Sequence, residues 1–514
     1  MGAVSLAWLI LRSVPRPSRL AYPCQQAALR TAWLACAMPV VTGVAALRGR
    51  ARPLVRFAFL CGLLFAGTWV ASSGSAPLAP TSVATPDAYR PQVFAVRDAR
   101  GVQPGRFGGV DDLSAVMDLH GLKWYRSDWP SAFAGPDGLI DTVSVVLLKI
   151  NAQWSQRGGT NTDVLRGVIR KVVEHPDGFN GEVIVADNGQ GLGDLNRGQS
   201  NAEDTTQSVL DVVNEFVTEG WPVSAMLWDG LRGTPVNEYV DGDPADGYVV
   251  SSALDPQTAI RVSYPKFRSP AGTYISYKRG VWSPETQSYD QDRLVVLNLP
   301  VLKTHSIYAV TAAVKNHMGV VTGAMATDSH SAVGRGGMGS VMAEVRLPDL
   351  TILDAIWILA RPGQGPSSSY VDATRRDVLL AATDPVALDV WATKHVLIPA
   401  ILENGYPATS FFTTQDPDNP ASRFRSYLDR SLAELLEAGV VSTNRPEQVE
   451  LRTWSGDADR DGDVDWHDSP AFIDCLTGPG GEVAPACRSC DFGWDQSIDL
   501  TDFALYQRQF SAGE

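Results

Sequence analysis

The sequence predicts an α/β fold with a mainly parallel sheet and helices on both faces, followed by a small C-terminal all-α module. Apolar runs alternate with segments of helical periodicity between residues 85 and 440, a pattern typical of parallel sheets. Polar groups follow several apolar runs directly, as at Asp187-Asn188-Gly189. Two acidic loops between residues 450 and 514 predict the separate module. The chain therefore divides into a leader (1–80), an α/β domain (85–440) and a tail (450–514).

The leader is basic and partly apolar. Residues 1–76 contain eight arginines and no Asp, Glu or Lys. Four of those arginines precede an apolar run at Phe57–Ala71, and small residues follow at Ser72–Ala76. This order predicts a secretory signal peptide or an N-terminal transmembrane anchor, and so an extracytoplasmic protein that is secreted, periplasmic or membrane-anchored. A buried helix of the folded domain is the alternative.

The rest of the chain is acidic. Because the whole chain carries a formal charge of −14 and residues 1–76 carry +8, the remainder carries −22. Nucleic acid is an unfavourable partner for such a surface, because its phosphates require Lys and Arg. Contact with a membrane is expected only through the leader. The charge suits an exported protein that holds calcium.

The α/β domain can be divided into expected strands and helices. Thr162 or Asp163 should cap a helix, because apolar residues then recur on one helical face up to Val173. Asp384 should cap another helix that starts at Pro385. Residues 229–292 are polar and rich in Gly and Tyr, which indicates irregular hairpins. The expected strands are Val143–Lys149, Gly181–Gly189, Val223–Trp228, Leu294–Leu299, Thr351–Leu359 and Val378–Ala382, and the other expected helices are Glu203–Val217 and Ile307–Met318.

Polar residues at the ends of these strands predict one shared site. Carboxyl ends of parallel strands gather at one edge of a sheet, where α/β proteins hold ligands. Three lysines would make the site positive inside an acidic protein, so we expect a small anionic ligand. The expected catalytic residues are Lys303, His305 and Lys315, with His305 as a proton donor or acceptor. The expected ligand-binding residues are Lys149, Asn151, Asp187, Asn316, Asp354 and Asp384.

Each of these residues also has a structural interpretation. Lys149 could extend into solvent, and Thr304 and His305 could cap the following helix. Asp384 could be only a helix cap, and Asp354 only a strand-end residue. His317 and His330 could bind a metal together with His305, although their spacing matches no standard motif. The glycine-rich run Gly334–Gly339 is expected to form a flexible lid.

Four blocks of the domain resemble the bacterial domain-of-unknown-function family 362. NLPVLKTHSIYAVTAAVKNHMGV, from Asn298 to Val320, resembles its N-x-P-x-x-K-T-H…K-N-x-x-G signature. The other blocks lie in the same order at Val145–Val173, Leu350–Pro366 and Leu379–Leu397. The resemblance spans roughly residues 90–400 and implies no particular reaction. Many family members carry iron–sulfur cysteine runs, and residues 62–474 contain no cysteine, so we expect no iron–sulfur cluster.

The tail contains two calcium-type loops. Alternate carboxylates on a tight loop converge on one point, and Gly462 permits the sharp bend of the first loop. The second loop has Gly493 and Gln496 at positions 3 and 6, so we expect it to bind Ca²⁺ more weakly. The expected ligands are Asp457, Asp459, Asp461, Asp463, Asp465 and Asp468 in the first loop, and Asp491, Asp495, Asp499 and Asp502 in the second.

This pair of loops resembles the dockerin type I module, with EF-hand-like loop–helix units. The resemblance implies Ca²⁺ as the cofactor and a cohesin-like or cell-surface protein as partner. No cofactor is expected for the central domain. Three cysteines lie in the tail, and we expect a disulfide from Cys475 to Cys487 or to Cys490.

Three functions are compatible with these features. The chain could be an exported enzyme that acts on a small anion by acid–base chemistry. It could instead be a non-catalytic ligand-binding or scaffold protein whose tail docks a partner. The tail alone suggests a component of an extracellular polysaccharide-degrading assembly, and no paired-carboxylate signature supports glycoside hydrolysis.

Overall fold

The computed structural model describes residues 85–453 and 466–510, except 482, 485, 486, 488, 489, 495 and 496. The predicted leader lies outside the described residues, as do the predicted calcium ligands Asp457, Asp459, Asp461, Asp463, Asp465 and Asp495.

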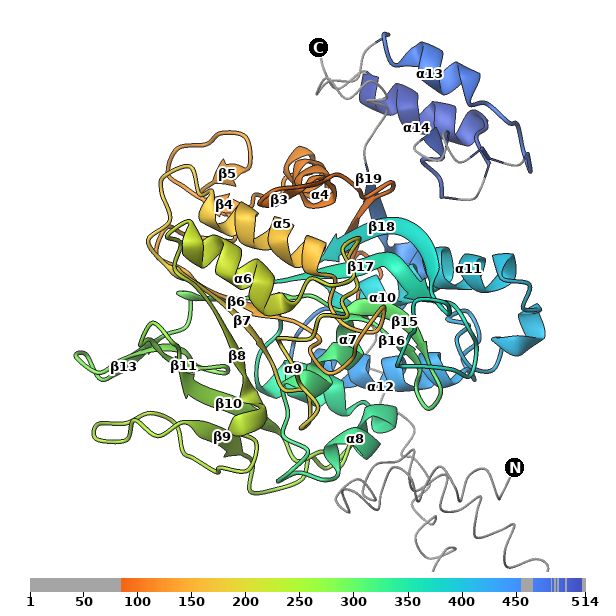
Figure 1. Cartoon of the computed structure of the whole chain (residues 1–514). Helices are drawn as coiled ribbons and strands as arrows, with labels where there is room; N and C mark the ends of the chain where they lie inside the picture. The colour runs from red at the N-terminus through yellow and green to blue at the C-terminus, as the bar shows by residue number, and fades with distance from the viewer. Residues whose placement is uncertain are drawn as a thin grey trace, which may run out of the picture. The chain divides into compact units, whose positions relative to one another are not determined.

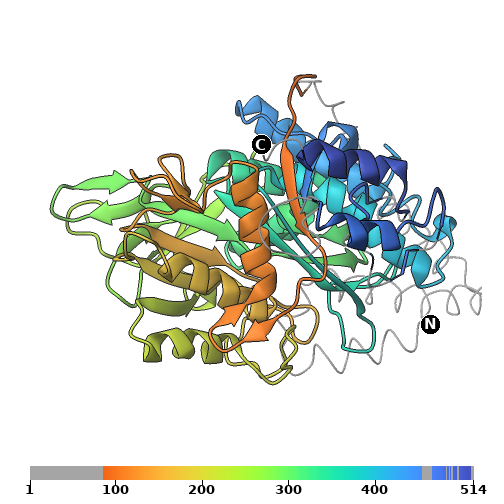
Figure 2. The ribbon, with the colours of Figure 1, turned by 90° about the horizontal axis from the view of Figure 1, so that it is seen from above.

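The described part contains a large mixed sheet with helices on both faces (Figures 1 and 2). Five neighbouring strands, β17-β14-β6-β7-β8, run parallel. The other edge is mixed, because β18 is antiparallel to both β17 and β1, while β1 and β19 are parallel. The strand order is β19 (Glu450–Thr453), β1 (Gln92–Val96), β18 (Thr374–Ala382), β17 (Leu350–Leu359), β14 (Leu294–Asn298), β6 (Val145–Lys149), β7 (Glu182–Asp187) and β8 (Val223–Leu227).

Two short strands extend this sheet at the end of β14. β15 (Val301–His305) pairs with β17 in parallel and with β16 (Ala309–Thr311) in antiparallel. The helix predicted over Ile307–Met318 is therefore wrong. The chain instead forms β16, the four-residue helix α7 (Ala313–Asn316) and a 3₁₀ turn at His317–Gly319. Lys303 consequently lies within β15.

Alternation along the strands explains why both faces are covered. Val146 and Leu148 of β6 contribute to one apolar cluster, while Val145 and Leu147 contribute to another. The first cluster packs under α4 (Gly108–Leu119), α5 (Thr162–Val173) and α6 (Val209–Thr218). The second packs against α7, α8 (Ser329–Ala332), α9 (Gly337–Glu344), α10 (Pro385–Ala392), α11 (Ile398–Glu403) and α12 (Arg423–Glu437).

Side-chain caps fix where the long helices begin. Asn161, one residue before the predicted cap, accepts hydrogen bonds from the backbone N–H groups of Asp163 and Val164. Ser208 and Asp211 form a capping box at the start of α6, so this helix begins six residues later than predicted. Asp384 caps α10 as expected, with Pro385 in its first turn.

Residues 229–292 form a second sheet instead of irregular hairpins. It is antiparallel in the order β13 (Ser288–Asp290), β12 (Gly280–Ser283), β11 (Tyr274–Ser276), β10 (Ser263–Arg268) and β9 (Gly247–Val250). Its buried side chains join the cluster on the α9 face of the large sheet. Two small two-stranded sheets are β2 (Val102–Gln103) with β3 (Arg106–Phe107) and β4 (Tyr125–Arg126) with β5 (Ala134–Gly135).

The glycine-rich run Gly334–Gly339 is packed and is not a lid. Gly337 starts α9, and Gly336 has a left-handed backbone with φ +93°. Added Cβ atoms at Gly336 and Gly339 would overlap Arg430 and Ser431 of α12. These glycines therefore allow α9 and α12 to approach closely.

Within the described residues, one continuous helical segment, Pro385–Glu403, is apolar and long enough to cross a membrane. An 18-residue stretch of this segment has a mean hydropathy of 1.3, but 72% of that stretch is buried inside the fold. We therefore assign it to the core, where it packs on the large sheet.

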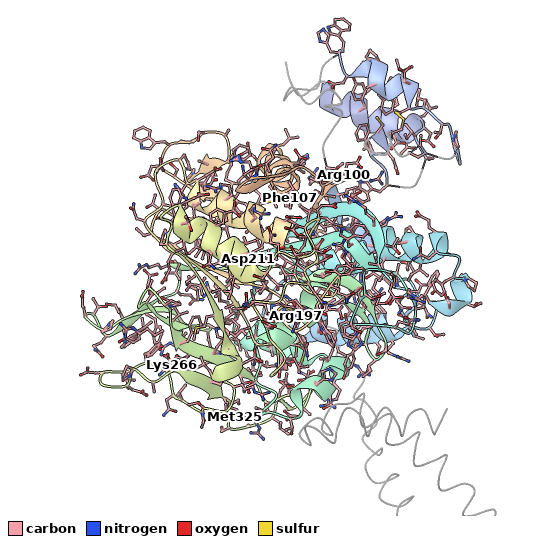
Figure 3. The ribbon with its side chains drawn as sticks, in the orientation of Figure 1. Arg100, Phe107, Arg197, Asp211, Lys266 and Met325 are labelled. Carbon is pink, nitrogen blue, oxygen red and sulfur yellow. A yellow bond between two sulfur atoms is a disulfide. The ribbon has the colours of Figure 1, made fainter. Side chains whose placement is uncertain are left out.

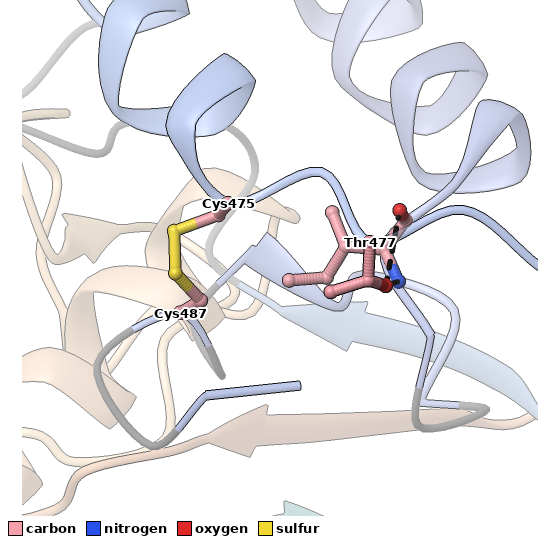
Figure 4. The surroundings of a disulfide bond; sticks show 4 residues. Cys475, Thr477 and Cys487 are labelled. Atoms are coloured by element: carbon pink, nitrogen blue, oxygen red, sulfur yellow. Dashed lines mark hydrogen bonds between the residues drawn. A yellow bond between two sulfur atoms is a disulfide. The ribbon is translucent and has the colours of Figure 1, made fainter. Parts of the chain in front are cut away.

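The tail has a small core of its own. α13 (Ser469–Asp474) and α14 (Leu500–Phe510) enclose Phe472, Ile498 and Tyr506. Cys475 and Cys487 form a disulfide, one of the two pairings left open by the sequence (Figure 4). β19 belongs to the large sheet, so the α/β domain extends to residue 453, beyond its predicted end at residue 440.

Candidate functional site

The three predicted lysines lie together, at the end of β6, within β15 and on α7. Each is buried, with exposed fractions of 1% for Lys149, 0% for Lys303 and 7% for Lys315. They lie close enough to influence each other, because the charges of Lys315 and Lys149 both lower the pKa of Lys303. The main cause of the lowered pKa is burial, which disfavours a charged ammonium. We call these three residues with His305 the lysine cluster.

Lys149 has a carboxylate partner. Its Nζ atom lies 3.0 Å from Oδ1 of Asp187 and donates to the carbonyl oxygens of Ile150 at 2.9 Å and Asn316 at 2.5 Å. Burial lowers the pKa of Lys149 and raises that of Asp187, and each charge opposes the shift of the other. Lys149 thus does not extend into solvent.

Gly319 allows this ion pair to form. A Cβ atom at residue 319 would overlap both the Asp187 carboxylate and the Lys149 ammonium. The Gly319 carbonyl also accepts a hydrogen bond from the backbone N–H of Asn188. The final glycine of the K-N-x-x-G signature therefore has a steric reason to be glycine, a role that the sequence did not reveal.

Lys303 and Lys315 differ from Lys149 in their partners. Lys303 donates to the carbonyl oxygen of Gly158, and the carboxylates of Asp187 and Asp354 partly offset the lowering of its pKa. No hydrogen bond or ion pair joins Lys315 Nζ to any residue that the structure describes; its described contact is the ring of Tyr308, 5.6 Å away. Burial, followed by the charge of Lys149, lowers the pKa of Lys315 to about 8.

His305 is fixed as a hydrogen-bond donor. Its Nδ1 atom accepts from the backbone N–H groups of Ile307 at 3.0 Å and Tyr308 at 3.1 Å. Burial, followed by the Lys315 charge, holds its pKa well below the usual range, so the ring is neutral. With Nδ1 accepting, the proton of the neutral ring lies on Nε2. A role as general base is therefore disfavoured, and the residue closes a turn instead of capping a helix.

The two other histidines of the predicted metal site, His317 and His330, are also neutral. His317 Nδ1 lies 3.2 Å from the carbonyl oxygens of Ala313 and Val314 and so donates a proton, and burial lowers its pKa to about 4. His330 has a pKa of about 3 for the same reason. Among the described residues, no group of three or more His, Cys, Asp or Glu side chains is placed to hold a metal ion.

Asp354 lies next to the lysine cluster, on β17. Its Oδ1 accepts from the backbone N–H of Ile356 at 2.9 Å, and its Oδ2 accepts from Asn201 Nδ2 at 2.8 Å. Burial raises its pKa to about 7, against the opposing charges of Arg157 and Lys303. Asp354 is thus a buried acid that is partly protonated near neutral pH, and its partner Asn201 was not predicted.

Three further predicted ligands have different surroundings. Asn316 donates from Nδ2 to Asn298 Oδ1 at 2.8 Å, so its amide is used within the fold. Asn151 has a buried side-chain oxygen without a hydrogen-bond partner in the described part.

Asp384 accepts hydrogen bonds from Val386, Ala387, Ser442 and Thr443. Its two carboxylate oxygens therefore serve the cap of α10 and the 442–443 segment, and the ligand-binding role predicted for Asp384 is not supported.

Asp389 was missed, although it lies in the block Leu379–Leu397 that resembles family 362. It is fully buried on α10, and its two oxygens accept from the backbone N–H groups of Ala313 at 2.7 Å and Val314 at 3.0 Å. Burial raises its pKa to about 7, although the two hydrogen bonds act in the opposite direction and lower it. Asp389 therefore holds the start of α7, the short helix that carries Lys315.

A separate cavity of about 340 Å³ lies on the α4 face of the sheet. It is lined by residues including Arg100, Phe107, Asp163, Trp357 and Arg375, and Figure 3 labels Arg100 and Phe107 near α4. Its arginines are already paired with Asp377 and Glu203. Since none of the lysine cluster lines it, we do not assign the site to this cavity.

In the tail, the second predicted calcium loop is closed by Asp502. This residue is fully buried, and its carboxylate accepts from the backbone N–H groups of Gly493 at 2.8 Å and Asp499 at 3.0 Å. The backbone N–H groups of Thr477 and Gly478 donate to the Ile498 carbonyl, and the Ile498 N–H donates to the Thr477 hydroxyl.

The comparisons identify one part of the chain. Residues 290–394 match the family model described as domain of unknown function (DUF362). That segment contains Lys303, His305, Lys315, Asp354 and Asp389. It is narrower than the resemblance seen in the sequence and includes neither Lys149 nor the tail. The comparison with solved structures gives no match.

A curated relative is a thylakoid-associated protein of Synechocystis sp., 34% identical over 128 residues. The alignment covers 22% of this chain and 39% of the relative. The chain therefore matches well under half of that protein, and the relative's name describes the relative alone.

Proposed function

We propose that this chain is an exported protein whose α/β domain binds or acts on a small anion at the lysine cluster. The observation that carries the proposal is Lys315, a buried cation without a hydrogen bond or ion pair in the described part of the chain. A buried unpaired charge is costly. A bound anion would supply the missing partner.

The neighbours of Lys315 favour the same ligand. Lys303 adds a second positive charge, and His305 adds an Nε2–H donor that has no partner among the described residues. Asp187 forms its ion pair with Lys149. The excess of positive charge in a buried site favours a carboxylate or phosphate group, since lysine binds either as a point charge.

The test is calorimetric titration of the full chain with phosphate and with succinate, at constant ionic strength. Binding of at least one anion is expected, and Lys315→Met should weaken it by about 10-fold or more, as expected for a lost charged partner. Lys394→Met is the matched control, because Lys394 pairs with Asp418 at the surface. Equal binding by both variants would contradict the site.

Turnover separates the enzyme from the non-catalytic alternative. Once a substrate is identified, Lys303→Ala and His305→Ala should abolish turnover if the site is catalytic. The same changes should alter only affinity if the protein is a binding or scaffold component. A role in a polysaccharide-degrading assembly is supported only by the likeness of the tail to dockerin.

We further propose that the tail binds Ca²⁺ and so serves docking or stability. The observation in favour is Asp502, whose buried carboxylate holds both ends of the second loop together. Such a closed loop is suited to an ion that takes six to eight oxygen ligands. Removal of calcium is expected to loosen the tail and to spare the α/β domain.

A further inference from the structure

Lys315 has a feature that anion binding alone does not require. Its amine is surrounded by cationic or neutral groups: Lys149 lowers its pKa, and its own charge lowers the pKa values of Lys303, His305 and His330. No carboxylate is among the groups that act on it. Lys149 and Lys303 are both held by hydrogen bonds to backbone carbonyls, and Lys315 is not.

The position of Lys315 restricts what the amine can contact. Its Nζ lies 5.6 Å from the ring centre of Tyr308, and this ring also contacts the rings of His305 and His330, each at 5.3 Å. The Tyr308 hydroxyl donates to the backbone carbonyl of His330 at 2.6 Å, which holds the ring in place. Lys315 is thus 93% buried, beside a fixed aromatic wall, with a donor at His305 Nε2.

We propose that Lys315 forms an imine with the carbonyl carbon of a small oxo acid, whose carboxylate is held by Lys303. The inference rests on the proposed anion site and names its substrate class. A lysine that lacks hydrogen bonds and lies beside another cation keeps its nitrogen lone pair available, which is the arrangement that activates lysine nucleophiles.

The step balances without an oxidant or reductant. The Lys315 nitrogen lone pair forms a bond to the carbonyl carbon, and the carbonyl π pair moves to oxygen, which takes a proton. The nitrogen loses one proton as the carbinolamine forms and a second as the carbinolamine dehydrates. The carbinolamine hydroxyl takes up a second proton, the C–O bond breaks as the nitrogen lone pair forms the C=N bond, and water leaves, so amine and carbonyl give imine and water. His305 Nε2–H can donate a hydrogen bond to the oxygen as negative charge develops there.

The experiment is reductive trapping on the full chain at neutral pH with sodium cyanoborohydride. Glyoxylate, the smallest oxo acid, is compared with acetaldehyde, an uncharged carbonyl of similar size. Glyoxylate should leave one N-carboxymethyl group at Lys315, found by peptide mapping. Its rate at Lys315 should exceed that at the surface residue Lys394 by about 10-fold or more, because the lowered pKa leaves more free amine and Lys303 holds the carboxylate. Acetaldehyde, which has no carboxylate, should show a smaller preference for Lys315.

Two variants complete the test. Lys315→Arg keeps the charge but has no nucleophilic amine, so the single fast adduct should disappear. Lys303→Met should slow glyoxylate labelling of Lys315 more than it slows acetaldehyde labelling, because only glyoxylate loses the partner of its carboxylate. Because the adduct is located in the wild-type chain, the result stands even if a variant fails to fold.

The outcomes separate this inference from the anion site. If phosphate or succinate binds in a Lys315-dependent manner but glyoxylate does not label Lys315 preferentially, the imine is wrong and the anion site stands. If glyoxylate and acetaldehyde label Lys315 equally fast, the oxo acid class is wrong. If neither labelling nor anion binding occurs, both proposals fail.

Discussion

Lys315 and Lys149 are the same residue type in one cluster, yet they should contribute to stability with opposite signs. Lys149 is paired with Asp187 at 3.0 Å, whereas Lys315 has no carboxylate among the groups that act on it. A buried lysine whose pKa falls from 10.5 to about 8 destabilises the folded state while it is charged. Function and stability therefore conflict at residue 315.

We predict that Lys315→Met raises the free energy of unfolding at pH 7 by up to about 3 kcal/mol, the equivalent of the pKa shift. The sign follows from proton binding. Between pH 8 and 10.5 the unfolded chain binds more protons at this lysine than the folded chain, so wild-type stability rises with pH there. The advantage of the variant should therefore shrink over the same interval.

Urea unfolding of both proteins at pH 7 and pH 10 measures this difference. Lys149→Met is the matched control, and it should destabilise the protein by about 3–5 kcal/mol, because Asp187 is left buried without its partner. A Lys315→Met variant that is less stable than the wild type at pH 7 would show that the ammonium has a stabilising partner.

The sequence predicted that the three lysines would lie together, but it did not predict which groups would contact them. Lys149, Lys303 and Lys315 were identifiable because each follows, or lies within, an apolar stretch where solvent-facing lysine is unexpected. Gly319 and Tyr308 were not identifiable as site residues, because their roles depend on contacts with residues distant in sequence. The ligand-binding role of Asp384 stays a prediction, since a carboxylate at a strand end can also cap the next helix, as Asp384 does.

At the scale of elements, the largest error was the helix predicted over Ile307–Met318. The segment is apolar in both helical and strand registers, so periodicity could not decide between them. Pairing of β16 with β15 makes the first part a strand, and only Ala313–Asn316 is α-helical. A four-residue helix is not stable through its own hydrogen bonds. α7 therefore depends on the two hydrogen bonds that its N–H groups donate to Asp389 of α10.

We predict that Asp389→Ala weakens anion binding by about 10-fold and lowers the free energy of unfolding by about 1–3 kcal/mol. Two buried N–H groups at the start of α7 would lose their acceptors, and Lys315 would lose its fixed position. Asp389→Asn keeps one acceptor oxygen and should recover part of both losses. Titration calorimetry and urea unfolding measure the two effects.

Asp211→Ala provides the control at the level of elements. Asp211 belongs to the capping box of α6, on the other face of the sheet (Figure 3). Its loss should cost about 1 kcal/mol of stability and leave anion binding unchanged. If Asp389→Ala behaves in the same way, Asp389 stabilises the fold without positioning the lysine cluster.

At the scale of the whole molecule, alternation predicted the mixed α/β class and the parallel half of the sheet. It could not predict the other edge, where β18 reverses direction and the N-terminal β1 lies between β18 and β19. Such edge pairing joins segments hundreds of residues apart and leaves no local pattern. Pairing of β19 with β1 is of this kind, and it extends the α/β domain to residue 453.

The tail and the α/β domain differ in what stabilises them, and this difference makes the calcium proposal testable on the full chain. Among the tail residues that the structure describes, the core consists of Phe472, Cys490, Phe492, Ile498 and Tyr506, and the Cys475–Cys487 disulfide cross-links it. A core of this size supplies little stability, whereas the α/β domain has two extensive clusters. Calcium should therefore matter only to the tail.

We predict that a calcium chelator increases hydrogen exchange in peptides from residues 466–510 and leaves peptides from the large sheet unchanged. Metal that binds only the folded tail stabilises it by mass action, so restored Ca²⁺ should reverse the effect and equal Mg²⁺ should reverse it less. Asp457→Ala with Asp461→Ala should make exchange insensitive to chelator. Asp474→Ala, an exposed carboxylate outside both loops, should respond like the wild type. Exchange that is identical with and without chelator would refute a calcium-binding tail.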